Sequence, residues 1–429
     1  MAVDFVRTAL AEGVNLSVLS DAKFKHNRLS VNLILPLCEE TVSDYAVLPL
    51  IMRKGSKSCC DFTELNRRLD SLYGAALACD VGKSGPNQIV TLGIKILDDR
   101  YAFGGEKLLE EAAKLLREIL FEPMIENGSF EEKSFELERQ FLIDTIKAQI
   151  NDKRSYAVSQ CRRLMGKDDP AAIRKYGEVE GAERITAASA AAAYEKMLDN
   201  ASIEIMLTGS GDPAAASAVM KKAFAGLKRH PIAFSASKQS EAGEKPLEQT
   251  EYLDVAQSKM VLGFRCGEKK TVEEQAAMRM MTALYGGTPS SKLFLNVREK
   301  LSLCYYCAAR YDRAASIVMV DCGVEKPNIE SAKAEILHQL DTIRENDFDD
   351  ETFENTRAQL KNALRAISDY ADSIEEWYLG KIIAGSIVSP AEEMRALEKV
   401  TREQVVEAAK SVKLDAVYLL TSKEENNAD

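Results

Sequence analysis

Hydrophobic residues recur along the chain at two spacings, one typical of strands and one typical of helices. Apolar residues at alternate positions predict a half-buried strand over 24–37, and short, mainly apolar runs predict strands over 203–208 and 416–421. Spacings of three and four residues predict helices over 63–73, 107–119, 129–153, 212–225, 272–284 and 328–345. Strands in separated pairs with helices between them predict an α+β fold, in which each mixed β-sheet has helices packed on one face.

The two halves of the chain repeat the same order of elements. The segment Phe135-Glu-Leu-Glu-Arg139 matches Phe353-Glu-Asn-Thr-Arg357, and both ends of the match are shifted by 218 residues. Further on, Ile185-Thr186 matches Val400-Thr401 with a shift of 215 residues. A nearly constant offset across several elements indicates an internal duplication.

The duplication divides the chain into two similar halves. We expect a first α+β repeat over 1–227 and a second over 251–429. The stretch 228–250 between them is polar and contains Pro231, Gly243 and Pro246, which is typical of a linker.

Composition narrows the class of protein and its partners. A net charge of −11 argues against nucleic acid or an anionic membrane as a partner, since both select for an excess of Lys and Arg. No stretch has the roughly 18 consecutive apolar residues of a membrane span, and the first residues lack the pattern of a signal peptide. Nine scattered cysteines, an odd number, favour reduced thiols over a disulfide framework. We therefore expect a cytoplasmic protein.

The stretch Ser290–Tyr306 combines a short amphipathic helix with a following strand. Thr288 is a possible N-cap for this helix, with Pro289 at its first position. Arg298 and Tyr305 lie seven residues apart within the stretch. A guanidinium offers a planar fork of donors and a phenol offers one directed O–H, so the pair could hold a peptide carbonyl. The simpler alternative is a surface arginine and a tyrosine at the edge of the core.

Two further patterns resemble metal sites. Cys304-x-x-Cys307 has the spacing of a zinc ribbon, but residues three apart on a regular strand point to opposite faces and cannot share a metal. Glu335-x-x-His338 has the spacing of a di-iron helix, but no second helix of that kind exists. We therefore predict no metal site from either pattern.

The duplicated chain, with Ser-Lys-Leu-Phe followed by Val-Arg-Glu-Lys and Leu-Cys-Tyr in its second half, resembles the pitrilysin/insulinase-like zinc peptidases. The resemblance is greatest to the branch of the mitochondrial processing peptidases and their bacterial relatives. It implies that the two repeats form one half of a clam shell. It also implies that Arg298 and Tyr305 grip the substrate backbone and stabilise the tetrahedral intermediate.

The same resemblance locates the zinc site of the family in the first half. There the family has His-x-x-Glu-His, with two histidines on one helix face as zinc ligands and the glutamate as general base, and a distant glutamate as the third ligand. Lys54-Gly55 and Glu138-Arg139 anchor the alignment. The four family positions fall on Ala46, Pro49, Leu50 and Thr145. Because none of these can bind zinc or act as a base, we expect no cofactor and no hydrolysis by this chain alone.

Some members of the family act as heterodimers, in which one subunit brings the zinc and the other brings the Arg/Tyr pair. The resemblance to zinc-lacking bacterial members therefore implies a non-catalytic subunit of a zinc metallopeptidase. Its partners would be a zinc-bearing homologous subunit and a peptide substrate, and a homodimer could form in isolation. The short Gly286-Gly-Thr-Pro289 replaces the long glycine-rich loop of the processing-peptidase α subunit, so recognition of mitochondrial presequences is not expected.

Two alternatives remain. The chain could be a purely structural or peptide-binding protein of the same fold with no role in proteolysis. It could also be an active homodimeric peptidase, which the missing zinc ligands disfavour.

Overall fold

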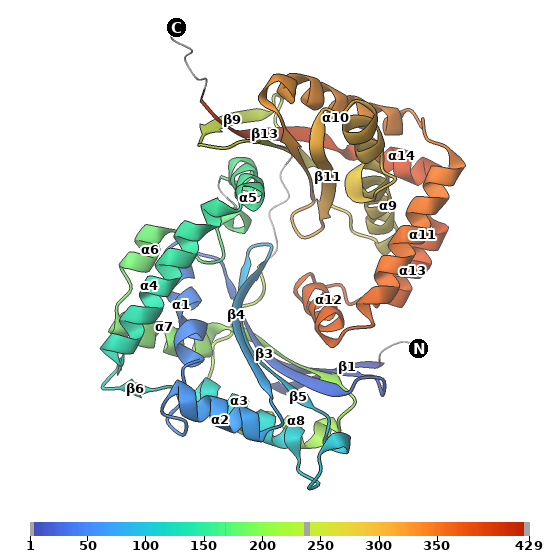
Figure 1. Cartoon of the computed structure of the whole chain (residues 1–429). Coiled ribbons are helices and arrows are strands. Elements are labelled where there is room, and N and C mark those ends of the chain that lie inside the picture. The colour runs from blue at the N-terminus through green and yellow to red at the C-terminus, as the bar shows by residue number, and fades with distance from the viewer. Residues whose placement is uncertain (1–3, 168, 236–240, 424–429) are drawn as a thin grey trace. The chain divides into compact units, whose positions relative to one another are not determined.

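The computed structural model describes residues 4–167, 169–235 and 241–423, and these form two compact α+β units (Figure 1). Unit 1 contains the described residues of 1–147, 173–236 and 368–387. Unit 2 contains those of 148–172, 237–367 and 388–429. The units are therefore interleaved along the sequence, in contrast to the predicted boundaries 1–227 and 251–429.

The sheet of unit 1 is mixed. In the described part of the unit its strand order is β1-β2-β8-β3-β5-β4. Only the β2–β8 pair is parallel, and the other neighbours are antiparallel. The strands are β1 (Asp4–Ala11), β2 (Val14–Ser20), β3 (His26–Pro36), β4 (Ala76–Ser84), β5 (Asn87–Leu97) and β8 (Ser202–Gly209). A separate two-stranded ribbon consists of β6 (Ile125–Glu126) and β7 (Ser129–Phe130).

Helices cover both faces of this sheet. Leu29, Val31 and Leu33 of β3 point into the main core, against which α1, α3, α7 and α8 pack. Arg28 and Ser30 point to the other face and contact α12. The helices of unit 1 are α1 (Val42–Met52), α2 (Phe62–Ser71), α3 (Leu108–Phe121), α4 (Glu132–Ala148), α6 (Val179–Glu183), α7 (Ala187–Asn200), α8 (Pro213–Phe224) and α12 (Ala371–Ile383), with one 3₁₀ turn, η1 (Asp99–Tyr101).

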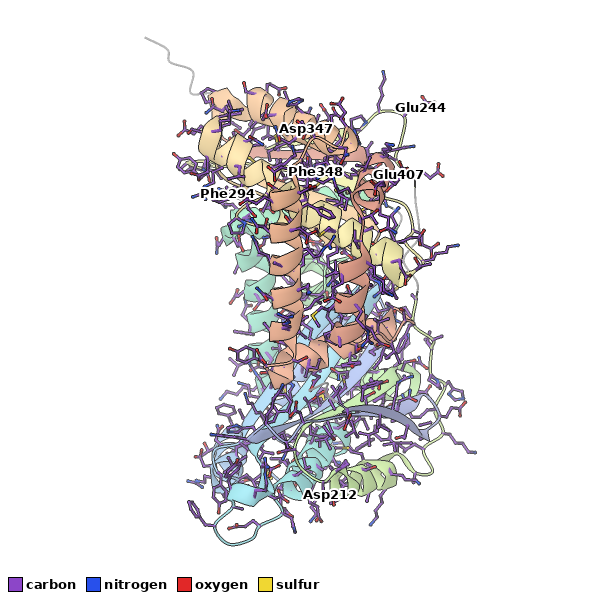
Figure 2. All side chains as sticks on the ribbon, turned by 90° about the vertical axis from the view of Figure 1, so that its right-hand side faces the viewer. Asp212, Glu244, Phe294, Asp347, Phe348 and Glu407 are labelled. Carbon is purple, nitrogen blue, oxygen red and sulfur yellow. The ribbon has the colours of Figure 1, made fainter. Side chains whose placement is uncertain are left out.

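The sheet of unit 2 has the order β11-β12-β10-β13-β9, and only β13–β9 is parallel. Its strands are β9 (Leu247–Tyr252), β10 (Ser258–Arg265), β11 (Cys304–Asp312), β12 (Ile317–Val324) and β13 (Lys413–Thr421). Its helices are α5 (Lys153–Met165), α9 (Val272–Thr282), α10 (Ile329–Arg344), α11 (Asp350–Ile367), α13 (Pro390–Lys399) and α14 (Arg402–Ser411). Helices α11 and α13 lie side by side (Figure 2). Shorter helical segments are η2 (Gln149–Asn151), η3 (Pro170–Ala172), η4 (Ala283–Gly287), η5 (Leu293–Lys300) and η6 (Lys326–Asn328).

The predicted duplication is confirmed by the strand order. Reading β9-β13-β10-β12-β11 against β2-β8-β3-β5-β4 matches every neighbour and every parallel or antiparallel pairing, and β1 is an additional edge strand of unit 1. The predicted α+β class with mixed sheets is also confirmed.

The repeated arginines have a structural role in each unit. Arg139 donates hydrogen bonds to the carbonyl oxygens of Glu183 and Ile185, at 3.2 and 3.1 Å. Arg357 bonds in the same way to Glu398 and Val400, at 3.3 and 2.7 Å. Each pair of carbonyls lies just before a helix that begins with a threonine N-cap. The repeated motif therefore fixes the start of α7 in one unit and of α14 in the other.

The predicted helix over 129–153 is wrong at both ends. Residues 129–130 form β7, and α4 ends at Ala148. After a single 3₁₀ turn, Asp152 caps a new helix, α5, by accepting the backbone N–H of Ser155 at 3.1 Å. The break matters because α5 packs in unit 2 whereas nearly all of α4 belongs to unit 1.

Helices α5 and α12 occupy equivalent places in the two repeats and were not predicted. Each packs on the sheet face opposite the main helical layer of its unit. In unit 2, Ala157 and Cys161 of α5 contact Val261 and Tyr418 of the sheet. Gly263 permits this close approach, because a Cβ there would overlap the sulfur of Met165. The prediction of helices on one face is therefore incomplete by one helix per unit.

The predicted linker 228–250 ends in a strand. Residues 236–240 lie outside the described residues, while 247–250 begin β9, which pairs in parallel with β13. The side chains of β9 are mostly exposed and polar, so its sequence resembles a linker although its backbone belongs to the sheet. Over the described ranges, no helix combines the length and apolarity that crossing a bilayer requires.

Candidate functional site

Arg298 lies on η5, a short π-helix of unit 2. The buried side chains of Leu293 and Val297 fix this helix in the core. The guanidinium of Arg298 stacks over the ring of Phe294, which is labelled in Figure 2, at 4.6 Å from the ring centroid. The predicted cap at Thr288 is wrong, because that residue follows the preceding helical segment and the cap position of η5 is Lys292. π-Helical segments are rare and occur frequently at functional sites.

A tight turn joins η5 to β11. Ser302 has a φ of 50°, in the left-handed region that residues with a side chain rarely adopt. Strand β11 then begins at Cys304, and its pairing with β12 is irregular between Cys304 and Tyr306. A β-bulge of this kind reverses the alternation of side chains and redirects the inserted residue. Tyr305 is that residue, and 62% of its side chain is exposed.

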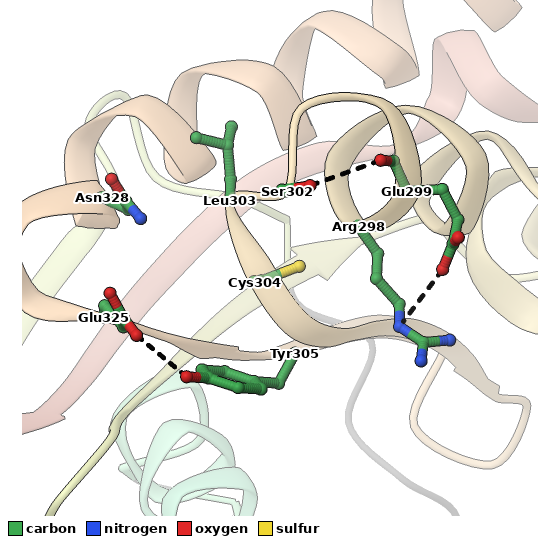
Figure 3. Close-up of a pocket in the computed structure, with 8 residues that line it drawn as sticks. All are labelled: Arg298, Glu299, Ser302, Leu303, Cys304, Tyr305, Glu325 and Asn328. Atoms are coloured by element: carbon green, nitrogen blue, oxygen red, sulfur yellow. Dashed lines mark hydrogen bonds and ion pairs between the residues drawn. The ribbon is translucent and has the colours of Figure 1, made fainter.

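Arg298 and Tyr305 line one pocket of about 430 Å³ (Figure 3). The side chain of Arg298 extends from η5 toward the strand that carries Tyr305, and the Tyr305 ring points toward Glu325. The lining residues are Arg298, Glu299, Ser302, Leu303, Cys304, Tyr305, Glu325 and Asn328. The structure thus brings together the two residues that the sequence singled out.

Two carboxylates accompany these donors. The Tyr305 hydroxyl donates a hydrogen bond to Glu325 Oε1 at 2.9 Å, and this contact raises the pKa of the phenol. The Nε of Arg298 lies 3.6 Å from Glu299 Oε1, a loose contact that involves only one donor of the guanidinium fork. Such a fork can bind a carbonyl or carboxylate, but the single O–H of Tyr305 must leave Glu325 before it can donate to a ligand.

Glu325 and Asn328 were not identified from the sequence. They lie after β12 and on η6, about 20 residues beyond Tyr305, and reach the pocket only because β11 pairs antiparallel with β12. The register of that hairpin, and hence Glu325 as the partner of Tyr305, depends on the bulge. Only a predicted hairpin over 304–324 would have indicated from the sequence that Glu325 lies near Tyr305.

The bulge also changes which face of β11 carries Cys304 and Cys307. These residues were expected on opposite faces of a regular strand, but the extra residue places both on the buried face. Cys322 on β12 lies directly opposite Cys307. Three buried thiols therefore gather beneath the pocket.

In unit 1, the three positions that the family resemblance aligned with His-x-x-Glu-His lie on α1, in or beside the core. Ala46 is fully buried, and Leu50 packs against the same cluster of side chains. Pro49 lies inside α1, where it lacks the N–H of a regular helical hydrogen bond. The helix nevertheless continues to Met52.

The fourth position, Thr145, lies on α4. Its hydroxyl donates to the carbonyl oxygen of Phe141 at 2.8 Å and is therefore used within its own helix. One turn earlier, the buried Glu138 binds Lys54 at 2.7 Å and Arg53 at 3.3 Å. These ion pairs join the end of α1 to α4, and each oxygen of the Glu138 carboxylate is paired with a cation.

The donor set at these four positions does not fit zinc. Alanine, proline and leucine have no side-chain donor, and zinc sites in proteins are built from Cys, His, Asp and Glu. Across the residues that the structure describes, no three such side chains, the three thiols beneath the pocket included, are arranged so that they could hold a metal. The roles of Arg298 and Tyr305 toward a substrate remain a prediction.

Comparison with known proteins finds similarity to the M16 peptidases. A family model described as "Peptidase M16 inactive domain" matches residues 184–360, the stretch that contains Arg298 and Tyr305. A curated relative from Bacillus subtilis (strain 168), named "Probable inactive metalloprotease YmfF", is 29% identical over 415 residues, which are 96% of either chain. The chain is thus similar to an M16 model over residues 184–360 and to an inactive metalloprotease over nearly its whole length. The family resemblance seen in the sequence is thereby confirmed.

Two solved structures share the fold along nearly the whole chain. A conserved protein from Enterococcus faecalis V583 has a TM-score of 0.90 and 28% identity, covering 99% of this chain and 100% of its own. A peptidase M16 inactive domain from Pseudomonas fluorescens has a TM-score of 0.79 and 16% identity, covering 98% and 99%. At that identity the second likeness concerns the fold alone.

Proposed function

We propose that this M16 homologue is the non-catalytic subunit of a heterodimeric zinc peptidase. It would bind the peptide substrate and supply Arg298 and Tyr305 to a site whose zinc belongs to a homologous partner chain. The observation that carries this proposal is the contrast between the two repeats. The Arg/Tyr pair is brought into one open pocket, whereas the positions of the zinc motif hold Ala46, Pro49, Leu50 and Thr145.

The pocket residues would act by hydrogen bonding. The guanidinium of Arg298 would hold a substrate carbonyl and stabilise the negative charge that develops on its oxygen during attack. Tyr305 would add a second donor after exchanging Glu325 for the substrate. Hydrolysis itself would need a metal-bound nucleophile and a base from the partner, because the four positions on this chain offer neither.

The names of the relatives support a non-catalytic role. The Bacillus subtilis relative is described as an inactive metalloprotease, and it matches this chain over nearly its whole length. Nothing in those names concerns a partner or a substrate, so these two parts of the proposal rest on the pocket and on the family resemblance.

The proposal is tested by co-expressing the chain with a zinc-bearing homologue and assaying unstructured peptides. The pair should hydrolyse them, and Arg298→Ala should lower the rate by about 10²–10³, the usual effect of removing one such donor. Arg395→Ala is the control, because Arg395 is an exposed arginine on α13 that does not line the pocket. An inactive pair, or an Arg298→Ala pair as fast as the parent, would refute the proposal.

One observation favours the alternative of a binding protein without a role in proteolysis. The Tyr305 hydroxyl is already hydrogen-bonded to Glu325 and is not free to donate to a substrate. Tyr305→Phe separates the two functions. It should slow hydrolysis by a peptidase pair, whereas peptide affinity of a pure binding protein should hardly change, since the ring remains.

A further inference from the structure

Three cysteines form a cluster at the base of the pocket. Cys304, Cys307 and Cys322 are 8%, 5% and 0% exposed, and Cys304 lines the pocket itself. Cys307 and Cys322 face each other directly across the antiparallel β11–β12 pair. Residues opposite each other in such a pair have Cα atoms about 4.5–5.5 Å apart, which lies within the range that a disulfide can bridge.

The pKa values of the three thiols are shifted in different directions. Hydrogen bonds from Cys307 and Cys322 lower the pKa of Cys304, and the positive charge of Arg298 adds to this effect. The same hydrogen bonds keep the pKa of Cys307 and of Cys322 above the ordinary value. One thiolate at the pocket is thus supported by two thiols behind it.

Cys161, Cys266 and Cys60 provide a comparison with the cluster. Burial raises the pKa of Cys161 and of Cys266 to about 12, so both remain thiols at neutral pH. Cys266 moreover directs its S–H to the carbonyl oxygen of Ser316 at 2.9 Å. Cys60 is exposed, and its thiol donates to the carbonyl oxygen of Lys57 at 3.5 Å. These residues provide internal references for reactivity.

We propose that this cluster is a peroxide-reactive site that closes a disulfide between Cys307 and Cys322. The proposal does not depend on the peptidase function. Cys304 is the entry point because it combines thiolate character with access from the pocket, and the other two thiols resolve its oxidised form. The substrate class is hydrogen peroxide or a small hydroperoxide that fits a pocket of about 430 Å³.

The chemistry balances in three steps. The Cys304 thiolate attacks one peroxide oxygen, the O–O bond breaks, and protonation of the leaving oxygen gives a sulfenic acid and water, or an alcohol in the case of a hydroperoxide. The thiol of Cys322 attacks the sulfenic sulfur, loses its proton and displaces a second water, which forms a Cys304–Cys322 disulfide. Cys307 then loses its proton and attacks the Cys322 sulfur, and Cys304 leaves as the regenerated thiolate; the proton released balances the one taken up by the leaving peroxide oxygen. The peroxide is reduced by two electrons, which the Cys307 and Cys322 thiols supply.

Formation of the Cys307–Cys322 disulfide would stiffen the β11–β12 hairpin, which carries Tyr305 and is followed directly by Glu325. The disulfide would lie on the buried face of the hairpin, behind the residues that form the pocket wall. Oxidation of the cluster would therefore affect the pocket directly, because the disulfide and the pocket residues lie on or directly beside the same two strands.

The test is alkylation and peptide mapping of the fully reduced, full-length chain after titration with hydrogen peroxide. We expect the nine alkylatable thiols to fall to seven, with the disulfide mapped to Cys307 and Cys322, before Cys60 is oxidised. Cys304→Ser should slow the loss at least tenfold, and Cys307→Ser should leave a Cys304–Cys322 disulfide instead. Cys266→Ser is the matched control and should leave the rate unchanged.

Three outcomes would overturn the proposal. One is that all three cluster thiols persist at a peroxide concentration that oxidises Cys60. Another is a disulfide that maps outside the cluster. The third is an unchanged rate in both Cys304→Ser and Cys304→Ala, with circular dichroism showing that both variants are folded. Mapping of the unsubstituted chain decides the question even if every variant misfolds.

Discussion

At the scale of residues, the pocket depends on one strained turn between η5 and β11. Ser302 holds a left-handed conformation there, at φ 50°. Residues with a Cβ pay for this conformation, while glycine adopts it freely. A strained residue beside a pocket is consistent with a place where the backbone is held for function.

Ser302→Gly should therefore stabilise the protein by about 0.5–1 kcal/mol. The gain would appear as a higher midpoint in urea denaturation of the full chain. Ser302→Ala is the control, because it removes the same hydroxyl but keeps the Cβ, and it should give no gain. A lower midpoint for Ser302→Gly would show that the turn is not strained.

Glu325 should control the ionisation of Tyr305. A tyrosinate beside the Glu325 carboxylate would place two negative charges together, so the contact raises the pKa of Tyr305. Glu325→Gln should bring that pKa back down toward its ordinary value of 10.0. The shift can be followed in the ultraviolet tyrosinate signal, with Glu325→Gln/Tyr305→Phe as the blank. An unchanged titration would mean that the hydrogen bond does not persist in solution.

At the scale of elements, the helices α5 and α12 each pack on the sheet of the unit that comes mainly from the other half of the sequence. Asp152 holds the start of α5 through the backbone N–H and the hydroxyl of Ser155, at 3.1 and 2.6 Å. These hydrogen bonds lower the pKa of Asp152 below its ordinary value of 3.8. The folded state thus favours the ionised carboxylate.

Asp152→Ala should cost about 1 kcal/mol at neutral pH, as the loss of an N-cap usually does. Because the pKa is lower in the folded than in the unfolded state, the capping contribution is fully present above pH 3.8 and disappears as the pH falls through the folded pKa. Denaturation midpoints of both proteins should therefore converge in acid. A difference that stays constant down to low pH would contradict this account.

Helix α1, which the family resemblance aligns with the zinc motif, gives a second prediction at this scale. Ala46 is fully buried, so Ala46→His forces a larger and polar side chain into a packed core. A loss of at least about 1–3 kcal/mol is expected, measured as a lower thermal midpoint. Thr145→Glu, at a half-buried position on α4, is the matched control and should change stability by less than about 0.5 kcal/mol. Equal stability of Ala46→His and the parent would mean that the motif position is not core.

Sequence patterns predicted the elements that have strong periodicity. The α+β class, the duplication and the Arg298–Tyr305 pair all followed from spacing and from a family motif. The extra helices were missed because α5 and α12 have weak amphipathic patterns and acquire their apolar neighbours only from the opposite repeat of the sequence. Cys304 and Glu325 were missed as pocket residues because one bulge, which local sequence does not specify, sets the register of β11 against β12.

At the scale of the whole molecule, two repeats of one fold have diverged in opposite directions. The repeated Arg139 and Arg357 retain the same backbone contacts, so the scaffold is shared. The first repeat has Ala46, Leu50 and Thr145 where the family resemblance places zinc ligands, whereas the second repeat offers Arg298 and Tyr305 to solvent in a pocket. Such a division makes chemical sense if another chain completes the site.

The most direct measurement of this central claim is a titration of a zinc-bearing homologue with increasing amounts of this chain. The peptidase rate should rise and reach a plateau at one chain per homologue. Titration with Arg298→Ala should saturate at the same ratio, since assembly is intact, but at a plateau about 10²–10³ lower. A plateau equal to that of the parent chain, or a rate that does not respond to the chain at all, would contradict the account.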